Sequence, residues 1–182
     1  MLASRSLIAA IAVASLFHSR DSLAQGAWTN ADVGSVGLAG SGSQVNGVWT
    51  ARGAGADIWG TADAFHFVHQ PLTGDGSLTV RVDALQHTSP FAKAGLMLRD
   101  GLSAGAAHVL LSIRPTGDLE FMQRTAQGAN TTFIATASTP PPYWLRLTRS
   151  ASTVAASIAT DGVTWTSVGS VSTALPSPWF PS

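Results

Sequence analysis

Short segments in which apolar and polar residues alternate follow one another along most of this chain. In residues 78–83, for example, Leu78, Val80 and Val82 alternate with polar residues. A period of two places successive side chains on opposite faces of a β-strand, and no stretch after the first 24 residues has the 3.6-residue period of a helix. Turns rich in glycine, asparagine or proline separate the segments, so the pattern predicts an all-β protein. We expect strands over residues 65–69, 78–83, 92–99, 108–113, 119–124, 143–148 and 154–158, with a return strand from residue 163.

Each expected strand has one apolar face, which predicts two packed antiparallel sheets around one core. Asp161-Gly162 is a typical hairpin turn between two of the strands. The residues that we expect to face the core are Phe65, Phe67, Leu78, Val80, Leu96, Leu98, Leu119 and Phe121.

The first 24 residues have the order of parts of a secretory signal peptide. A basic start around Arg5 precedes the apolar run from Leu7 to Phe17, and a polar stretch then ends in Ser22-Leu23-Ala24. The run is shorter than the roughly 20 residues that span a bilayer, so we expect cleavage near Ala24 and no membrane span. The expected organisation is a signal peptide over 1–24, a β-sandwich domain over 25–170 and a proline-rich tail over 171–182. The expected location is outside the cytoplasm, extracellular or periplasmic.

Charge and cysteine content narrow the expected partners. The chain has ten basic and ten acidic residues; without Arg5, Arg20 and Asp21, eight and nine remain, a net charge of −1. With only 11% charged residues and one lysine, Lys93, the chain lacks the basic surface that nucleic acids need, so we expect no nucleic-acid partner. It has no cysteine, so its stability has to come from core burial and not from disulfides.

Several motifs then resemble one known family. The stretch from Val36 to Val82, "AKAGLMLRD", "PPYWLRLTRS" and "SIATDGVTWTSVGS" are similar, in this order, to the concanavalin-A-like domain of unknown function of secreted bacterial proteins, which is often attached to carbohydrate-active enzymes. The likeness runs from about Asp32 to Ser170. It implies an antiparallel jelly-roll β-sandwich of the concanavalin-A-like superfamily, and it implies no ligand.

The resemblance ends at the C-terminus. Family members continue past the "TW" hairpin into further strands, whereas this sequence continues only with "TALPSPWFPS". We therefore expect a C-terminally truncated domain whose closing strands are missing. An open sheet edge of this kind recruits other strands, so a protein partner or self-association is expected there.

The carboxylates do not form the pattern of a glycosidase. Retaining glycosidases need two carboxyl groups about 5 Å apart, and Glu120 is the only glutamate of the chain. Aspartate pairs, Asp57 with Asp63 or Asp75 with Asp83, are an alternative, but aspartates beside glycines are more simply turn residues. His66 and His69 point to opposite faces of one strand, which disfavours a shared metal ion. We expect no catalytic residue, no metal and no cofactor.

One group of residues suggests a binding face. If the apolar residues face the core, His66, Arg81, Arg99 and Arg124 share the opposite sheet face, with Trp59 just before it. Arginine and histidine hydrogen-bond sugar hydroxyls, and an exposed tryptophan stacks on a pyranose ring. The alternative is that the arginines pair with Asp83, Asp57 or Asp63 and only solvate the face.

Taken together, the residues favour a secreted, non-catalytic carbohydrate-binding module with an extracellular glycan as its partner. The second hypothesis is a structural or protein-interaction module, and a glycoside hydrolase comes third.

Overall fold

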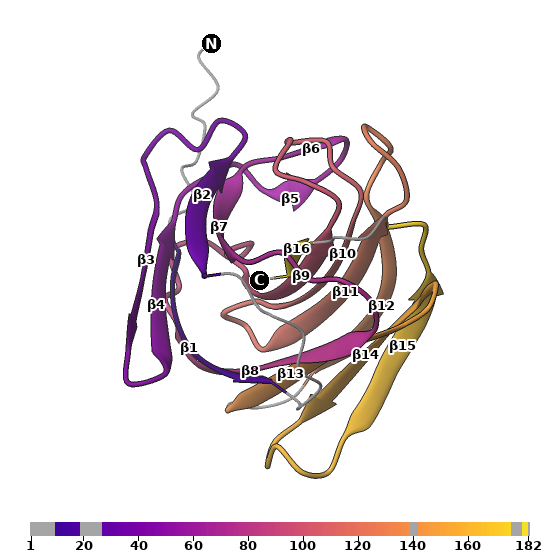
Figure 1. The fold of residues 1–182 in the computed structure, drawn as a ribbon. Coiled ribbons are helices and arrows are strands. Elements are labelled where there is room, and N and C mark those ends of the chain that lie inside the picture. Colours follow the sequence, from indigo (N-terminus) through magenta and orange to yellow (C-terminus); the bar gives the residue numbers. More distant parts are fainter. Residues whose placement is uncertain (1–9, 19–26, 139–141, 176–179, 182) are drawn as a thin grey trace.

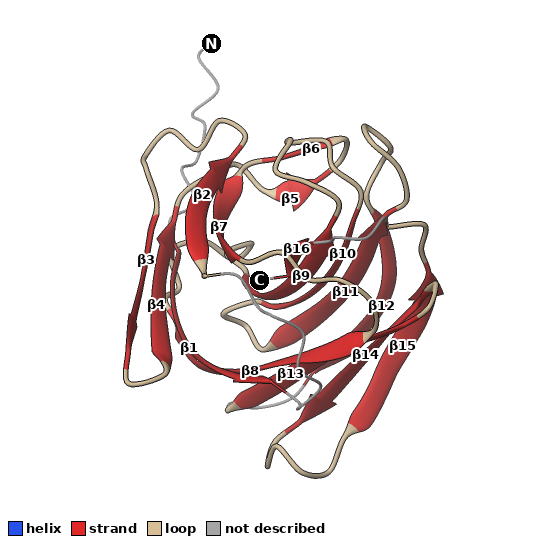
Figure 2. Ribbon diagram, viewed as in Figure 1, coloured by secondary structure: helices blue, strands red, loops and turns tan. Residues whose placement is uncertain are grey.

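The computed structural model consists of strands and loops in the residues that it describes, which are 10–18, 27–138, 142–175 and 180–181 (Figure 2). For residues 10–18 and 180–181 it describes the backbone only. The all-β prediction is confirmed, and every pairing between the described strands is antiparallel.

Two curved sheets face each other as a β-sandwich (Figure 1). The larger sheet has seven strands in the order β15-β14-β13-β8-β1-β4-β3. Its strands are β1 (Ala10–His18), β3 (Ser41–Val45), β4 (Val48–Gly53), β8 (Gly76–Leu85), β13 (Tyr143–Ser150), β14 (Thr153–Ala159) and β15 (Thr166–Ser172). The smaller sheet has five strands in the order β12-β11-β10-β9-β16. Its strands are β9 (Ala94–Arg99), β10 (His108–Ile113), β11 (Asp118–Arg124), β12 (Thr132–Ser138) and β16 (Phe180–Pro181).

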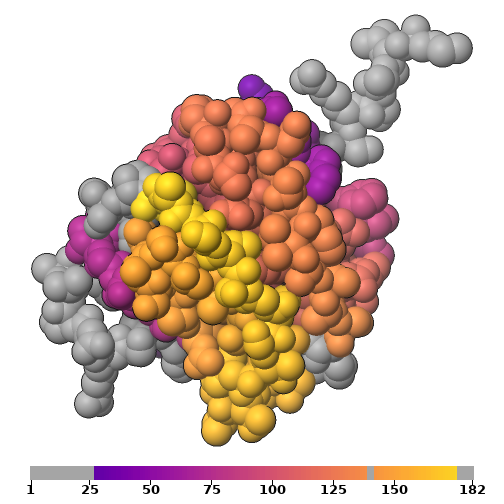
Figure 3. All heavy atoms as spheres, turned by 90° about the vertical axis from the view of Figure 1, so that its right-hand side faces the viewer, coloured from indigo at the N-terminus to yellow at the C-terminus, as the bar shows by residue number. Residues whose placement is uncertain are grey.

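The main core lies between these two sheets, where the alternation predicted it. Leu78, Val80, Leu96, Leu119 and Phe121 are all at most 4% exposed. Seen from the side, the C-terminal strands lie directly against the β12 region, so the two sheets meet along this flank (Figure 3).

A further layer covers the other face of the five-stranded sheet. It consists of two short antiparallel pairs, β2 (Thr29–Val33) with β7 (Phe65–His69), and β5 (Ile58–Trp59) with β6 (Ala62–Asp63). A second apolar cluster fills the space beneath this layer; its buried members are Val33, Ile58, Phe67, Met97, Leu110 and Met122. Phe67 therefore belongs to the second cluster and not to the main core, and Phe65 packs against that cluster while staying partly exposed. As a result, β10 and nearly all of β11 are buried on both faces.

The strand β1 is formed by residues at the centre of the predicted signal peptide. It lies between β4 and β8, antiparallel to both. The remainder of the predicted signal peptide, residues 1–9 and 19–24, lies outside the described residues.

Candidate functional site

The five residues of the expected binding face do not share one face. Trp59 lies on β5 and is 48% exposed, and His66 lies on β7. Arg81 lies on β8, in the other sheet of the sandwich. Arg99 and Arg124 are 0% and 1% exposed. The prediction of a common exposed face is therefore wrong. The extra layer that covers β9 to β11 buries Arg99 and Arg124, and Arg81 lies in the other sheet.

Arg124 is the centre of a buried charge cluster beneath that layer. Its guanidinium donates to both carboxylate oxygens of Asp63, at 2.7 and 2.8 Å. The remaining donors reach Thr131 Oγ1 at 2.9 Å and four backbone carbonyl oxygens at 3.0–3.2 Å, those of Gly60, Ala104, Ala106 and Ala129. A guanidinium has five N–H donors, so this set occupies it within the protein. Through these hydrogen bonds, Arg124 on β11 binds β6 and the loops that contain Gly60, residues 104–106 and residues 129–131.

Arg99 and His108 complete the buried cluster. Arg99 Nη1 lies 3.5 Å from Asp63 Oδ2, and its other donors reach the carbonyl oxygens of Gly101 at 2.6 Å and Ser103 at 2.7 Å. Burial lowers the pKa of Arg99 to about 10, which leaves it charged at neutral pH. Burial, together with the charges of Arg124 and Arg99, lowers the pKa of His108 to about 3. The cluster thus holds two cations, one neutral histidine and one carboxylate.

The carboxyl group of Asp63 is the counter-ion of this cluster. Asp63 is 2% exposed and lies at the end of β6. Burial raises the pKa of this carboxyl, and the hydrogen bonds and charge of Arg124 act in the opposite direction. The sequence offered two interpretations of Asp63, as a partner of Asp57 in an acid and base pair or as a partner of the arginines, and the structure shows the second. For Asp57 the interpretation as a turn residue fits, since Asp57 Oδ1 accepts a hydrogen bond from the backbone N–H of Ile58 at 2.7 Å.

His66 is packed against glycines and an acidic partner. Its Nδ1 lies 2.8 Å from Asp32 Oδ1, and its side chain is 4% exposed. A Cβ added at Gly40 would lie 2.3 Å from the His66 ring, and one at Gly53 would lie 2.8 Å from its Cβ. Burial acts to raise the pKa of Asp32, but hydrogen bonds from His66 and the Gly40 N–H lower it overall. This arrangement joins β7 to β2 and to the loop before β3.

Arg81 belongs to a different surface. It donates to Asp83 at 2.5 Å and lies over the Trp144 ring, 5.9 Å from the centroid. That ring system is also close to Gly162, where an added Cβ would lie 2.8 Å from the ring. The pairing of arginines with Asp83 and Asp63 that the sequence offered as the alternative is therefore present. Trp144 thus packs against other residues of the protein.

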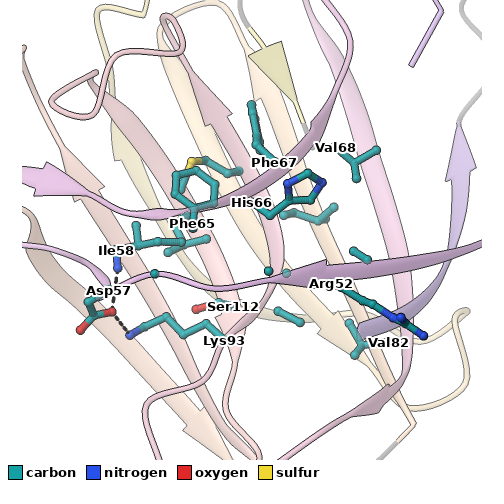
Figure 4. A pocket seen from close by; sticks show the side chains of 18 of the residues that line it. Arg52, Asp57, Ile58, Phe65, His66, Phe67, Val68, Val82, Lys93 and Ser112 are labelled. Atoms are coloured by element: carbon teal, nitrogen blue, oxygen red, sulfur yellow. Dashed lines mark hydrogen bonds and ion pairs between the residues drawn. The ribbon is translucent and has the colours of Figure 1, made fainter. Parts of the chain in front are cut away.

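A cavity of about 190 Å³ lies between the layers, bounded mainly by β4, β7, β8 and β9. Its walls are mostly apolar, with Trp49, Phe65, Val80 and Met97 among them. Figure 4 shows Asp57 and Lys93 at one side of this cavity and Arg52 and Val68 at the other, with His66 between β7 and the cavity. A cavity with such walls suits an apolar group better than a sugar.

An open groove lies next to this cavity, and of its lining residues the sequence had pointed only to Trp59 as part of a binding face. We call it the aromatic groove. Three aromatic side chains border it, and each is about half exposed: Trp59 at 48%, Phe91 at 52% and Phe133 at 48%. The groove has a volume of about 590 Å³. Its lining residues are Asp57, Trp59, Phe91, Lys93, Arg114, Asp118, Glu120, Met122, Phe133 and Thr136.

A network of charged side chains lines the aromatic groove. Lys93 Nζ donates to Asp57 Oδ1 at 2.5 Å and lies 3.7 Å from Glu120 Oε2. The other oxygen of Glu120 accepts a hydrogen bond from Arg114, whose guanidinium lies 4.8 Å from the centroid of the Phe91 ring. Lys93 and Glu120 are 7% and 9% exposed, so the network holds these side chains in fixed positions. The cavity and the groove meet at Asp57, Phe91 and Lys93, which line both.

The predicted aspartate pairs are not arranged as acid and base. Asp63 is enclosed with Arg124, whereas Asp57 bonds Lys93. Asp75 accepts from the backbone N–H of Ala151 at 2.7 Å, whereas Asp83 bonds Arg81. Across the described ranges, no group of three or more histidine, aspartate or glutamate side chains is placed to hold a metal ion.

Comparisons with family models, with curated proteins and with solved structures give no match to this chain. In the described part of the chain, no helix has the length and apolar character needed to cross a membrane.

Proposed function

We propose that the protein is a non-catalytic carbohydrate-binding module and that the aromatic groove is its binding site. The observation that carries this proposal is the combination of three half-exposed aromatic rings with a fixed charge network between them. The export signal and the resemblance to concanavalin-A-like domains support it, and a jelly-roll connection of the strands is part of the proposal.

The chemistry of the groove suits a sugar. A pyranose has one apolar face, which stacks on an exposed aromatic ring, and hydroxyl groups, which need donors and acceptors at its edge. Among the described residues, no aromatic ring or cation stacks on Trp59 or Phe133, so both rings are available for stacking. Asp57, Lys93 and Glu120 supply both donors and acceptors nearby. Of the five residues predicted from sequence, the groove retains only Trp59.

The charge of the groove narrows the class of sugar. Its lining contains three carboxylates, Asp57, Asp118 and Glu120, and two cations, Lys93 and Arg114, which sum to −1. A like charge placed against this lining is disfavoured. We therefore expect neutral oligosaccharides to bind better than oligosaccharides of uronic acids.

The first functional prediction concerns Trp59. We expect Trp59→Ala to weaken binding of the preferred neutral oligosaccharide about tenfold or more, because a stacked aromatic ring contributes on the order of 1.4 kcal/mol or more to such a site. The affinity is measured by isothermal titration calorimetry after a screen of the protein on neutral and uronic-acid glycans. Phe133→Ala, which removes another exposed ring of the groove, should act in the same direction.

The matched control is Trp165→Ala. Trp165 is a half-buried tryptophan under Arg146, whose guanidinium lies 3.9 Å from the ring centroid, and it lies outside the groove. This variant should bind the glycan as the wild type does. If Trp59→Ala and Trp165→Ala have equal affinities, or if the wild type binds no glycan of the panel, the proposed site is wrong.

The absence of catalysis is part of this proposal. Asp57 and Glu120 each accept a hydrogen bond from a cation, an arrangement that suits binding better than proton transfer to a glycosidic oxygen. An assay for reducing ends released from the same glycan panel checks this point. Hydrolysis of any of these glycans would favour the glycoside hydrolase hypothesis instead. The alternative function, a structural or protein-interaction module, draws on the exposed edge strand β3 and on the strand arrangement treated next.

A further inference from the structure

The strand β1 holds the seven-stranded sheet together. It is in register with residues Val48–Gly53 of β4 on one side and with seven residues of β8, from Leu78 to Leu85, on the other. No other described strand lies between β4 and β8. Without β1, the sheet separates into the β3-β4 hairpin and the four strands β15-β14-β13-β8.

The neighbours of β1 require a strand in this position. On β8, Val80 and Val82 are 4% and 3% exposed, and on β4, Trp49 is 8% exposed. In the register of the sheet, these residues pair with positions 14 and 16 of β1. An empty slot would leave two rows of backbone N–H and C=O groups unpaired at the border of a buried core, which is unfavourable. An extended strand in this slot pairs with both rows.

The same nine residues have a second role in the sequence. They form most of the apolar run of the predicted export signal, which is expected to be cut near Ala24. A cut at that point would separate β1 from the rest of the chain, since the strand ends at His18. After the cut, only non-covalent contacts with β4 and β8 would hold the segment.

We propose that the slot between β4 and β8 is a strand-acceptor site and that its occupant is the Ala10–His18 segment, which stays bound as a separate peptide after cleavage. This is strand addition to a sheet, in which backbone hydrogen bonds supply affinity and the side-chain pattern supplies register. The proposal does not depend on carbohydrate binding. It gives the protein a peptide-binding function in the seven-stranded sheet, whereas the groove is lined by residues of β5, β11, β12 and neighbouring loops.

Paired cysteines in the full chain test the register. The chain has no cysteine, so an introduced pair forms the sole disulfide. Ala12→Cys combined with Ala51→Cys joins two residues that lie directly opposite each other on β1 and β4. We expect this pair to oxidise readily and the pair Ala12→Cys with Thr50→Cys to stay reduced, because a shift by one residue places the thiols on opposite faces. Equal oxidation of both pairs, or of neither, would overturn the proposed placement.

Cleavage of the full chain tests the binding. A specific protease site inserted beside Ala24 allows the folded protein to be cut in place. We expect the released segment to co-elute with the body on size exclusion, and a labelled synthetic peptide of residues 9–19 to exchange into the slot. A peptide with Ser15→Pro should not exchange, because Ser15 pairs with both Val48 and Arg81 and proline lacks the N–H group.

Hydrogen exchange separates the outcomes. If the segment dissociates while the amides of β4 and β8 keep their protection, the slot needs no strand and the proposal fails. If the segment dissociates and those amides lose protection, the slot needs a strand but the segment is not its stable occupant, and the proposal also fails. Retention with protected amides supports it, whether or not any glycan binds.

Discussion

Asp63→Asn is expected to destabilise the protein by about 3–5 kcal/mol, because it leaves the buried guanidinium groups of Arg99 and Arg124 without their counter-ion. The side chains of all three residues are 0% exposed, so water cannot replace the lost carboxylate. Asparagine keeps the shape of the side chain, so the decrease in the free energy of unfolding measures the effect of removing the negative charge. Urea unfolding, followed by tryptophan fluorescence, gives the free energy of unfolding.

The control for this prediction is Asp83→Asn. Asp83 also pairs with an arginine, Arg81, but the two side chains are 25% and 42% exposed. An exposed pair of this kind contributes about 0–1 kcal/mol, so the variant should stay close to the wild type. Similar losses in the two variants would show that burial does not set the strength of the Asp63 pair.

The second large effect is a loss of stability in mild acid that depends on His108. The pKa of this side chain is about 3 in the folded protein, against an ordinary value of 6.5. Below pH 6.5 the unfolded chain therefore binds a proton at this position that the folded protein does not bind. The contribution of His108 to stability is complete above pH 6.5 and falls by about 1.4 kcal/mol per pH unit below it, until the pH approaches 3.

The measurement compares wild type and His108→Leu by urea unfolding at pH 6.5 and pH 5. Over this interval the wild type should lose about 2 kcal/mol more than the variant, which has no proton to bind at this position. His87→Leu is the matched control, because it removes a histidine whose side chain is exposed to water in the folded protein. Parallel profiles for wild type and His108→Leu would mean that the folded protein can protonate this ring.

The sandwich was predictable from the sequence because alternation is a local property. The predicted strands at 65–69 and 108–113 have the same bounds as β7 and β10, and the predicted apolar faces of β8, β9 and β11 form the main core. The prediction of the return strand is less accurate. It was expected from residue 163, but β15 begins at Thr166, because the chain between Asp161 and Trp165 forms a longer turn.

The extra layer was not predictable from alternation alone, and this is why the binding face was wrong. Arg99 and Arg124 occupy the face of the sheet that is polar in a two-layer sandwich, so an exposed position was the simple interpretation. A signal was nevertheless present. Met97, Leu110 and Met122 interrupt the polar pattern on that same face, and strands that are apolar on both faces are buried on both. Two arginines among such residues indicate a buried ion pair.

The aromatic groove could not be predicted from the sequence for a different reason. Its rings come from β5, from the loop before β9 and from β12, and its five charged residues lie at positions 57, 93, 114, 118 and 120. Only the tertiary fold brings these residues together. Trp59 alone had a local signal, as an aromatic residue next to a turn.

The position of β1 also bears on the time course of folding. β1 ends at His18, whereas its partners β4 and β8 begin at Val48 and Gly76. β8 in turn pairs with β13, where Arg149 lies opposite Gly76. Pairings between such distant residues require large loops to close before any contact forms, which slows folding to milliseconds or seconds. β1 precedes both of its partners in the chain, so it is synthesised before either strand that flanks it exists, and it can take its place between them only after they are made.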